Sequence, residues 1–204
     1  MKLLPLTFLL ALTTAAPIST RDTLTEAQLI SIAPKSSSCD DAPAEGECAT
    51  AKQAAQFISQ SFDTYKVISK AEQAAVIGLM AFETLDFKYN KNHFPGVAGQ
   101  GNPARNMQFP EFNKKYAASI PALKDKIAGV SDPADLLDLL RNDGATDFGS
   151  GAWFLTTQCS KDVRSALADG SEAGWQKYTT ECVGTTVTDD RKAYWQRAVK
   201  ALGV

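Results

Sequence analysis

The chain contains very little histidine: His93 is its single one. A Ser-His-Asp arrangement would have to use it, and no GxSxG nucleophile motif is present. CxxC and CxxH spacings are also absent, so we expect no zinc site built from cysteine and histidine. The sequence therefore predicts no bound metal and no cofactor.

Basic side chains are not in excess either. Of the 204 residues, 21 are basic and 23 are acidic, and no basic cluster is available to bind phosphate groups. This balance excludes nucleic acid as a partner. No Asn-x-Ser or Asn-x-Thr sequon occurs, so N-glycosylation is not expected.

Long hydrophobic runs are missing after the first residues. Leu3 to Leu12 is apolar, but this run is shorter than the roughly 20 residues that cross a bilayer. Lys2, the apolar run and the small residues up to Ala16 follow the order of a secretory signal. We expect residues 1–16 to be removed and the remaining chain to be secreted, with no membrane partner.

Only four cysteines are present, and in a secreted chain four cysteines allow three disulfide pairings. Proximity along the chain favours Cys39 with Cys48 and Cys159 with Cys182. Each disulfide would restrict the unfolded chain and so stabilise the fold by about 2 to 4 kcal/mol.

Alternation of polar and apolar residues, which indicates strands, is scarce, whereas helical spacing recurs along the chain. Residues 17–46 are predicted to be a leader and linker with one short helix, begun by a capping box of Thr23 and Glu26. Residues 47–204 should then form one helical domain. We expect an all-α monomer with at most a small β-hairpin within residues 84–108. The remaining helices are predicted at residues 48–62, 69–82, 110–120, 134–140, 153–159, 163–168, 174–178 and 190–202, with a Gly-rich loop at residues 142–151.

The most apolar helix is the one predicted at residues 69–82. Ser69 and Glu72 form a capping box, and every residue from Ala74 to Phe82 is apolar or glycine. A helix without a polar face belongs in the middle of a fold. At its end, apolar neighbours and the helix dipole favour a neutral Glu83 carboxyl group. Such a group suits general-acid cleavage of a glycosidic bond, although a polar helix end that faces water gives the same pattern.

The loop after Glu83 combines glycines with amide side chains that suit sugar hydroxyl and acetamido groups. Its segments FET, DFKYN, GQG and NMQ resemble the lysozyme-like superfamily, in particular the goose-type lysozymes and lytic transglycosylases. The resemblance implies a lysozyme-like helical domain with Glu83 as general acid and Thr84 as its hydroxyl neighbour. Residues 102–106 interrupt the family pattern, so Gln100 and Gln108 stay alternatives for one cleft position. The predicted substrate-binding residues are Thr84, Asp86, Tyr89, Asn90, Gln100, Asn106, Met107 and Gln108.

A second catalytic carboxylate is predicted at Asp147, because the Gly-rich segment that follows it would form a cleft wall. Asp86 and Asp143 are the alternatives, and Asp143 and Asp147 could equally cap turns. The predicted function is a secreted glycoside hydrolase of the muramidase type, acting in cell-wall degradation on a β-1,4-linked amino-sugar polymer. Peptidoglycan is favoured over chitin or chitosan as the polysaccharide substrate. A secreted, non-catalytic glycan-binding protein or effector is the alternative.

Overall fold

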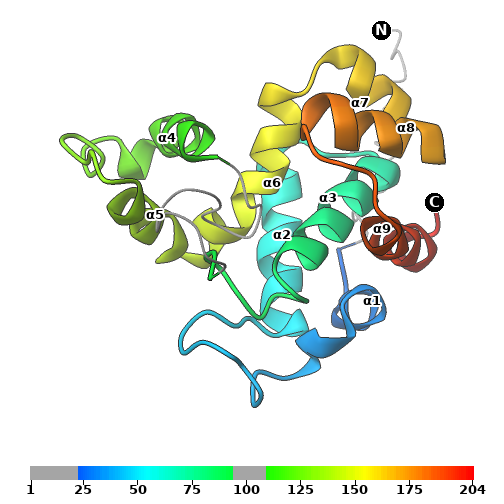
Figure 1. Cartoon of the computed structure of the whole chain (residues 1–204), viewed down its shortest axis with the longest axis horizontal. Coiled ribbons are helices and arrows are strands. Elements are labelled where there is room, and N and C mark those ends of the chain that lie inside the picture. Colours follow the sequence, from blue (N-terminus) through cyan, green and yellow to red (C-terminus); the bar gives the residue numbers. More distant parts are fainter. Residues whose placement is uncertain (1–22, 94–108) are drawn as a thin grey trace, which may run out of the picture.

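The computed structural model describes residues 23–93 and 109–204, and within these ranges the fold is all-α, as predicted (Figure 1). Residues 94–108 of the predicted hairpin lie outside the described residues, and residues 84–88 are turns. In the described ranges, two 3-10 turns, η1 and η2, and one π-helical turn, η3, accompany the α-helices. The elements are α1 (Glu26–Ile32), η1 (Pro34–Ser37), α2 (Ala51–Tyr65), α3 (Lys70–Glu83), α4 (Pro110–Ser119), η2 (Pro121–Leu123), α5 (Pro133–Arg141), α6 (Gly144–Gln158), α7 (Lys161–Ala168), α8 (Glu172–Lys177), η3 (Tyr178–Cys182) and α9 (Asp189–Leu202).

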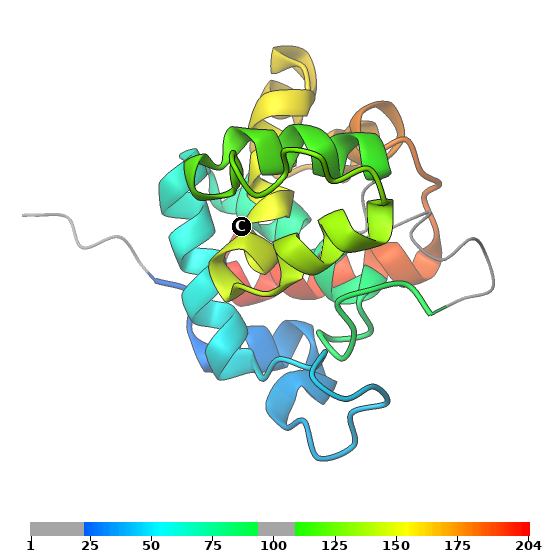
Figure 2. The same cartoon turned by 90° about the vertical axis from the view of Figure 1, so that its left-hand side faces the viewer.

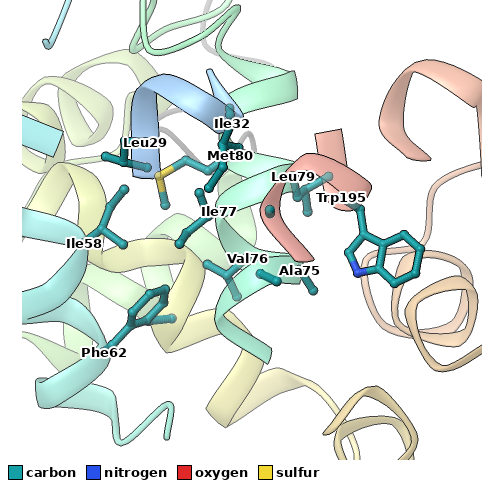
Figure 3. Close-up of a cluster of buried hydrophobic side chains, with 14 of the residues drawn as sticks. Leu29, Ile32, Ile58, Phe62, Ala75, Val76, Ile77, Leu79, Met80 and Trp195 are labelled. Carbon is teal, nitrogen blue, oxygen red and sulfur yellow. The ribbon is translucent and has the colours of Figure 1, made fainter. Parts of the chain in front are cut away.

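Helix α3 runs through the middle of the molecule, as predicted. Every residue from Ala74 to Ala81 is buried, so no face of this segment meets solvent. Figure 3 shows Ile77 and Met80 on the side of α1 and α2, and Leu79 on the side of Trp195 from α9. Because it is packed on both sides, α3 holds the position of the residues that follow its end.

Helix α6 is a second central helix, and its first half was not predicted. The expectation of a Gly-rich loop at residues 142–151 is wrong, because Asp143 caps a helix there and residues 147–155 are all buried. The glycines permit close packing instead of a turn. A Cβ atom on Gly149 would overlap the hydroxyl group of Tyr116 from α4.

Helices α4 and α5 form a lobe with an apolar cluster of its own. In Figure 1 they lie at one end of the molecule, while α7 and α8 lie at the other, and Figure 2 shows the lobe from its own side. Tyr116 from α4 and Leu140 from α5 meet Trp153 and Phe154 from α6 in this cluster. Since Phe148 and Leu155 of α6 belong to the main core, α6 joins the two clusters.

Both predicted disulfides are present. Cys39–Cys48 closes the loop between η1 and α2, and Cys159–Cys182 joins the end of α6 to η3. Two disulfides agree with export to an oxidising compartment. The predicted signal, residues 1–16, lies outside the described residues. In the part of the chain that the structure describes, no helix combines the length and the apolar character needed to cross a membrane.

Helix starts follow local capping signals, with two corrections. Ser69 caps α3 through its side chain, as predicted, but Glu72 does not complete a capping box, because its carboxylate pairs with Arg164 at 2.7 Å. Helix α1, however, is begun by Thr25 and Gln28, and the prediction of Thr23 and Glu26 is wrong. The Gln28 amide also donates to a backbone carbonyl of α9 at 3.1 Å. Gln28 therefore both completes the capping box of α1 and joins α1 to α9, which is distant in the sequence.

Candidate functional site

The chain makes an unusual turn directly after α3. Leu85, Asp86 and Phe87 have φ angles of 52°, 60° and 66°. Side chains with a Cβ rarely adopt this left-handed region, and each such residue costs roughly 1 to 3 kcal/mol. Three in succession persist only where the surroundings determine the backbone. We call residues 84–88 the left-handed turn, and it is the centre of the candidate site.

Hydrogen bonds from α3 and from Ala49, which lies just before α2, hold the left-handed turn. The Thr84 hydroxyl donates to the Met80 carbonyl (2.7 Å) and accepts the Phe87 N–H (3.1 Å). The Phe87 carbonyl accepts the Ala49 N–H (3.0 Å). The Phe87 ring is fully buried, 5.8 Å from the Phe148 ring of α6. Thr84, predicted on the substrate side, is itself buried and bonded to backbone groups.

Asp86 is a buried carboxylate that receives two donors. It accepts the Lys35 N–H at 2.9 Å and the Tyr194 hydroxyl at 2.5 Å. Burial is the largest cause that raises the pKa of Tyr194 above its ordinary range, and the hydrogen bond to Asp86 is the next largest. The Tyr194 hydroxyl therefore keeps the proton that it donates. Asp86, an alternative for the second catalytic carboxylate, links η1 and α9 to the left-handed turn.

Lys88 ends the left-handed turn and is also buried. Its ammonium group pairs with the Asp41 carboxylate and donates to the Ser38 carbonyl at 2.8 Å. The hydrogen bond from Lys88 lowers the pKa of Asp41. Ser38 and Asp41 lie beside Cys39 in the chain. The Cys39–Cys48 disulfide therefore holds the loop that supplies both partners of the Lys88 ammonium group.

Glu47 organises the next part of the site. Its buried carboxylate lies 2.9 Å from Nε2 of His93, 3.5 Å from the Lys91 ammonium and 3.7 Å from the Arg141 guanidinium. It also accepts the Asn90 N–H at 3.4 Å, and Arg141 donates to the Asn90 side-chain oxygen at 2.6 Å. The His93 and Lys91 side chains are each 40% exposed. One buried acid thus positions nitrogen groups at the protein surface, and we call Lys91, His93 and Arg141 the basic edge.

Glu83, predicted as a general acid, has an ion-pair partner that the sequence did not reveal. Its carboxylate accepts from Arg191 Nη2 at 3.0 Å and from Nε at 3.3 Å. The Arg191 guanidinium also lies over the Phe82 ring, 4.7 Å from its centroid. The pair joins the end of α3 to the start of α9, so Glu83 contributes to holding these two helices together.

Asp147, predicted as the second catalytic carboxylate, is buried in the first turns of α6. Its charge is felt by Tyr116 of α4. Burial is the largest cause that raises the pKa of Tyr116, and the nearby Tyr65 hydroxyl and the Asp147 carboxylate raise it further. The Tyr116 hydroxyl donates to the Thr146 carbonyl at 2.9 Å. Glu83 of α3 bonds to Arg191 of α9, whereas Asp147 of α6 lies near Tyr116 of α4. The two predicted catalytic acids therefore belong to two different helix contacts.

The other predicted site residues divide into two groups. Tyr89 and Asn90 join the basic edge: the Tyr89 and His93 rings lie 5.1 Å apart, and Asn90 bonds to Arg141. The second group lies outside the described residues, so its predicted role stays a prediction. It consists of Gln100, Asn106, Met107 and Gln108.

Sequence reasoning missed Glu47, Arg141 and Arg191. Glu47 stands in a linker-like stretch next to a cysteine, and the two arginines read as ordinary helix charges. Their partners are far away in the chain, so no local spacing indicates them. The one available signal was the disulfide, because closing residues 39–48 fixes where Glu47 can lie.

The described residues offer no metal centre. Within residues 23–93 and 109–204, no group of three or more His, Cys, Asp or Glu side chains could hold a metal ion. The His93 ring is bonded to Glu47, and all four cysteines are in disulfides. The site is therefore a rigid, charged surface built on a strained turn.

Comparison with known proteins gives one informative similarity. No family model matches, and no solved structure matches. The chain is 48% identical over 160 residues to a bifunctional dioxygenase-epoxy alcohol synthase of Fusarium oxysporum. This alignment covers 74% of the chain but only 12% of the Fusarium protein.

The similarity corrects the predicted function. The relative is named for dioxygenase and epoxy alcohol synthase activities, so the prediction of a glycoside hydrolase of the muramidase type, active in cell-wall degradation, is wrong. The general expectation of an enzyme, without the glycoside hydrolase class, agrees with the name of the relative, which is an enzyme. The resemblance to the lysozyme-like superfamily stays a resemblance in one segment.

Proposed function

We propose that this chain is an accessory unit of an oxygenation system that converts an unsaturated lipid into an epoxy alcohol. The observation that carries the proposal is the 48% identity over 160 residues to part of the Fusarium enzyme. Since the matched stretch is a small part of that enzyme, we assign the chain a supporting role. Its two disulfides support an oxidising compartment for this role.

The chemistry in the relative's name indicates the substrate class. A dioxygenase adds both atoms of O₂ to a substrate, and such a step on an unsaturated chain forms a hydroperoxide. An epoxy alcohol has the same atoms: the O–O bond breaks, one oxygen bridges the neighbouring double bond, and the other remains as hydroxyl. Both steps therefore require an apolar, unsaturated chain.

This chain does not itself fit an oxygen-activating iron site. An iron site of two histidines and one carboxylate needs two histidines, and the chain has one. The His93 ring is bonded to Glu47, and each cysteine sulfur is in a disulfide. We therefore assign the chain no step at iron. Its role in the proposal is to contact the catalytic unit.

We assign contact with the catalytic unit to the basic edge. Glu47, buried beneath it, and the strained turn beside it restrict its motion. A preorganised surface loses little conformational entropy on binding, and positive groups steer an acidic partner toward it. In this proposal, the acidic partner that the basic edge contacts is a surface of the catalytic unit.

The test uses the Fusarium enzyme without its matched segment. We expect the deletion to lower the yield of epoxy alcohol per O₂ consumed, and this chain, added as a separate protein, to restore it. The variant Lys91→Glu should restore less, whereas Lys52→Glu, which changes an exposed lysine of α2, should restore as well as the native chain. A deletion that changes neither O₂ uptake nor epoxy alcohol yield would contradict the proposal.

A further inference from the structure

The basic edge contains the single histidine of the chain, His93. Histidine is the side chain that ordinarily gains or loses its charge between about pH 5 and pH 8, whereas ordinary Asp, Glu, Lys and Arg side chains keep one charge state over this range. The His93 side chain is 40% exposed, so protons from solvent reach the ring. A change in the charge of the basic edge over this range therefore centres on one imidazole.

The contact with Glu47 fixes the form of the neutral ring. Nε2 of His93 lies 2.9 Å from each of the two carboxylate oxygens of Glu47. Since an ionised carboxylate only accepts hydrogen bonds, Nε2 carries the hydrogen and donates it. The other ring nitrogen, Nδ1, is then the atom that takes up a proton, and the Glu47 bond is kept when it does.

Charges around His93 cancel while the ring is neutral. Glu47 comes from the loop before α2, and Arg141 of α5 lies 3.7 Å from it and pairs with the Asp138 carboxylate at 2.8 Å. From the segment of His93 itself, the Lys91 ammonium group lies 3.5 Å from Glu47. These four groups supply two negative and two positive charges. Protonation of His93 therefore leaves the basic edge with one positive charge in excess.

Neighbouring contacts hold the ring in place in both charge states. The Tyr89 ring lies 5.1 Å from the His93 ring, and an aromatic ring attracts a cation. The Asn90 N–H bonds to Glu47 at 3.4 Å, and Arg141 bonds to the Asn90 side-chain oxygen at 2.6 Å. None of these contacts needs the Nδ1 proton. Protonation thus changes the charge of the basic edge and keeps its shape.

We propose that protonation of His93 converts the basic edge from a charge-balanced surface into a positive one, and so tightens its contact with an acidic surface of the catalytic unit at low pH. This inference rests on the proposed function, which supplies the partner. It adds regulation by pH to that contact. Because proton uptake and binding are linked, an acidic partner in turn favours the protonated ring.

The test measures binding of the purified full chain at low ionic strength, at about pH 5.5 and about pH 8. Two probes are used, poly-L-aspartate and the Fusarium enzyme without its matched segment. Native protein should bind each probe about threefold more tightly at the lower pH. His93→Gln, which stays neutral, should bind weakly at both pH values, and His93→Arg, which stays charged, should bind tightly at both.

A relocated histidine is the matched control. His93→Gln combined with Gln176→His keeps one imidazole in the chain but moves it to an exposed position of α8, at the end of the molecule opposite to α5 (Figure 1). This double variant should bind like His93→Gln. Proton NMR of the native chain follows the single imidazole directly, and its C2 proton signal should shift over the same pH range as the affinity.

The outcomes separate this inference from the proposed function. An imidazole signal that does not shift between about pH 5.5 and pH 8, or the same pH dependence of binding in His93→Gln as in the native chain, would overturn the inference. Recovery of pH dependence by the relocated histidine would overturn it as well. Binding to poly-L-aspartate that depends on His93 supports it even if the truncated enzyme needs no accessory unit. Restoration of epoxy alcohol yield that is equal for His93→Gln and native chain at both pH values would leave the accessory role intact and contradict its control by pH. Far-UV circular dichroism of each variant checks the fold.

Discussion

Single side chains fix the segment that follows the left-handed turn, and Glu47 is the clearest case. Its side chain is 3% exposed and lies next to three basic groups from two parts of the chain. Arg141 bonds at the same time to the exposed carboxylate of Asp138 at 2.8 Å. The same guanidinium therefore has one buried and one exposed acidic partner.

This pair allows a matched test. Glu47→Gln removes a buried charge and leaves the basic groups without their common partner, so we expect a loss of about 3 kcal/mol in the free energy of unfolding. Asp138→Asn removes an exposed partner of the same arginine and should cost less than about 1 kcal/mol. Urea unfolding followed by circular dichroism measures both values. Equal losses in the free energy of unfolding would contradict the expectation that the buried Glu47 contributes more to stability than the exposed Asp138.

At the scale of elements, the contact between α3 and α9 depends on a glycine. A Cβ atom on Gly78 would lie 3.0 Å from the Trp195 Cα, closer than packed side chains normally come to a backbone. Trp195 in turn stacks on Trp175 of α8, with ring centroids 4.9 Å apart. A shift of α9 would therefore disturb α8 as well.

We expect Gly78→Val to destabilise the protein by about 2 kcal/mol, because overpacking a core forces backbone shifts that cost about 1 to 3 kcal/mol. Trp fluorescence should change with it, since the Trp175–Trp195 stack moves. Ala118→Val introduces the same β-branched side chain at an exposed position of α4 and should cost less than about 1 kcal/mol. A thermal midpoint for Gly78→Val like that of Ala118→Val would contradict this packing argument.

Prediction of the elements succeeded where the signal was local. Ser69 caps α3 and Asp132, followed by Pro133, begins α5, because a cap acts within a few residues. It failed at residues 142–151, where composition indicated a loop. The glycines there serve contacts such as that of Gly149 with Tyr116, and such a contact is invisible until α4 and α6 are packed together.

At the scale of the whole molecule, buried tyrosines set the response to alkaline pH. Burial raises the pKa of Tyr116, Tyr178 and Tyr194 above the value of about 10 expected in an unfolded chain. The folded protein then holds protons that the unfolded chain has released. Stability from this source is fully present below about pH 10 and is lost as the pH rises further.

We expect the urea midpoint to stay level from about pH 7 to pH 9 and to fall steadily above about pH 10. Absorbance of tyrosinate near 295 nm should rise together with unfolding, since buried hydroxyls ionise when they are exposed. Tyr116→Phe removes one buried hydroxyl and should make the fall less steep. A midpoint that does not change up to about pH 11.5 would contradict the argument from burial.

The sequence by itself determined what depends on neighbours in the chain: an all-α fold, the central helix that ends at Glu83, the residues that cap α3 and α5, and the two disulfides between nearby cysteines. Only the tertiary structure decided what these parts do together. It paired Glu83 with Arg191, placed Glu47 beneath the basic edge and buried Asp147 against α4. The physical reason is that a charge takes its role from the groups within a few ångströms of it, and packing brings those groups from distant positions in the chain.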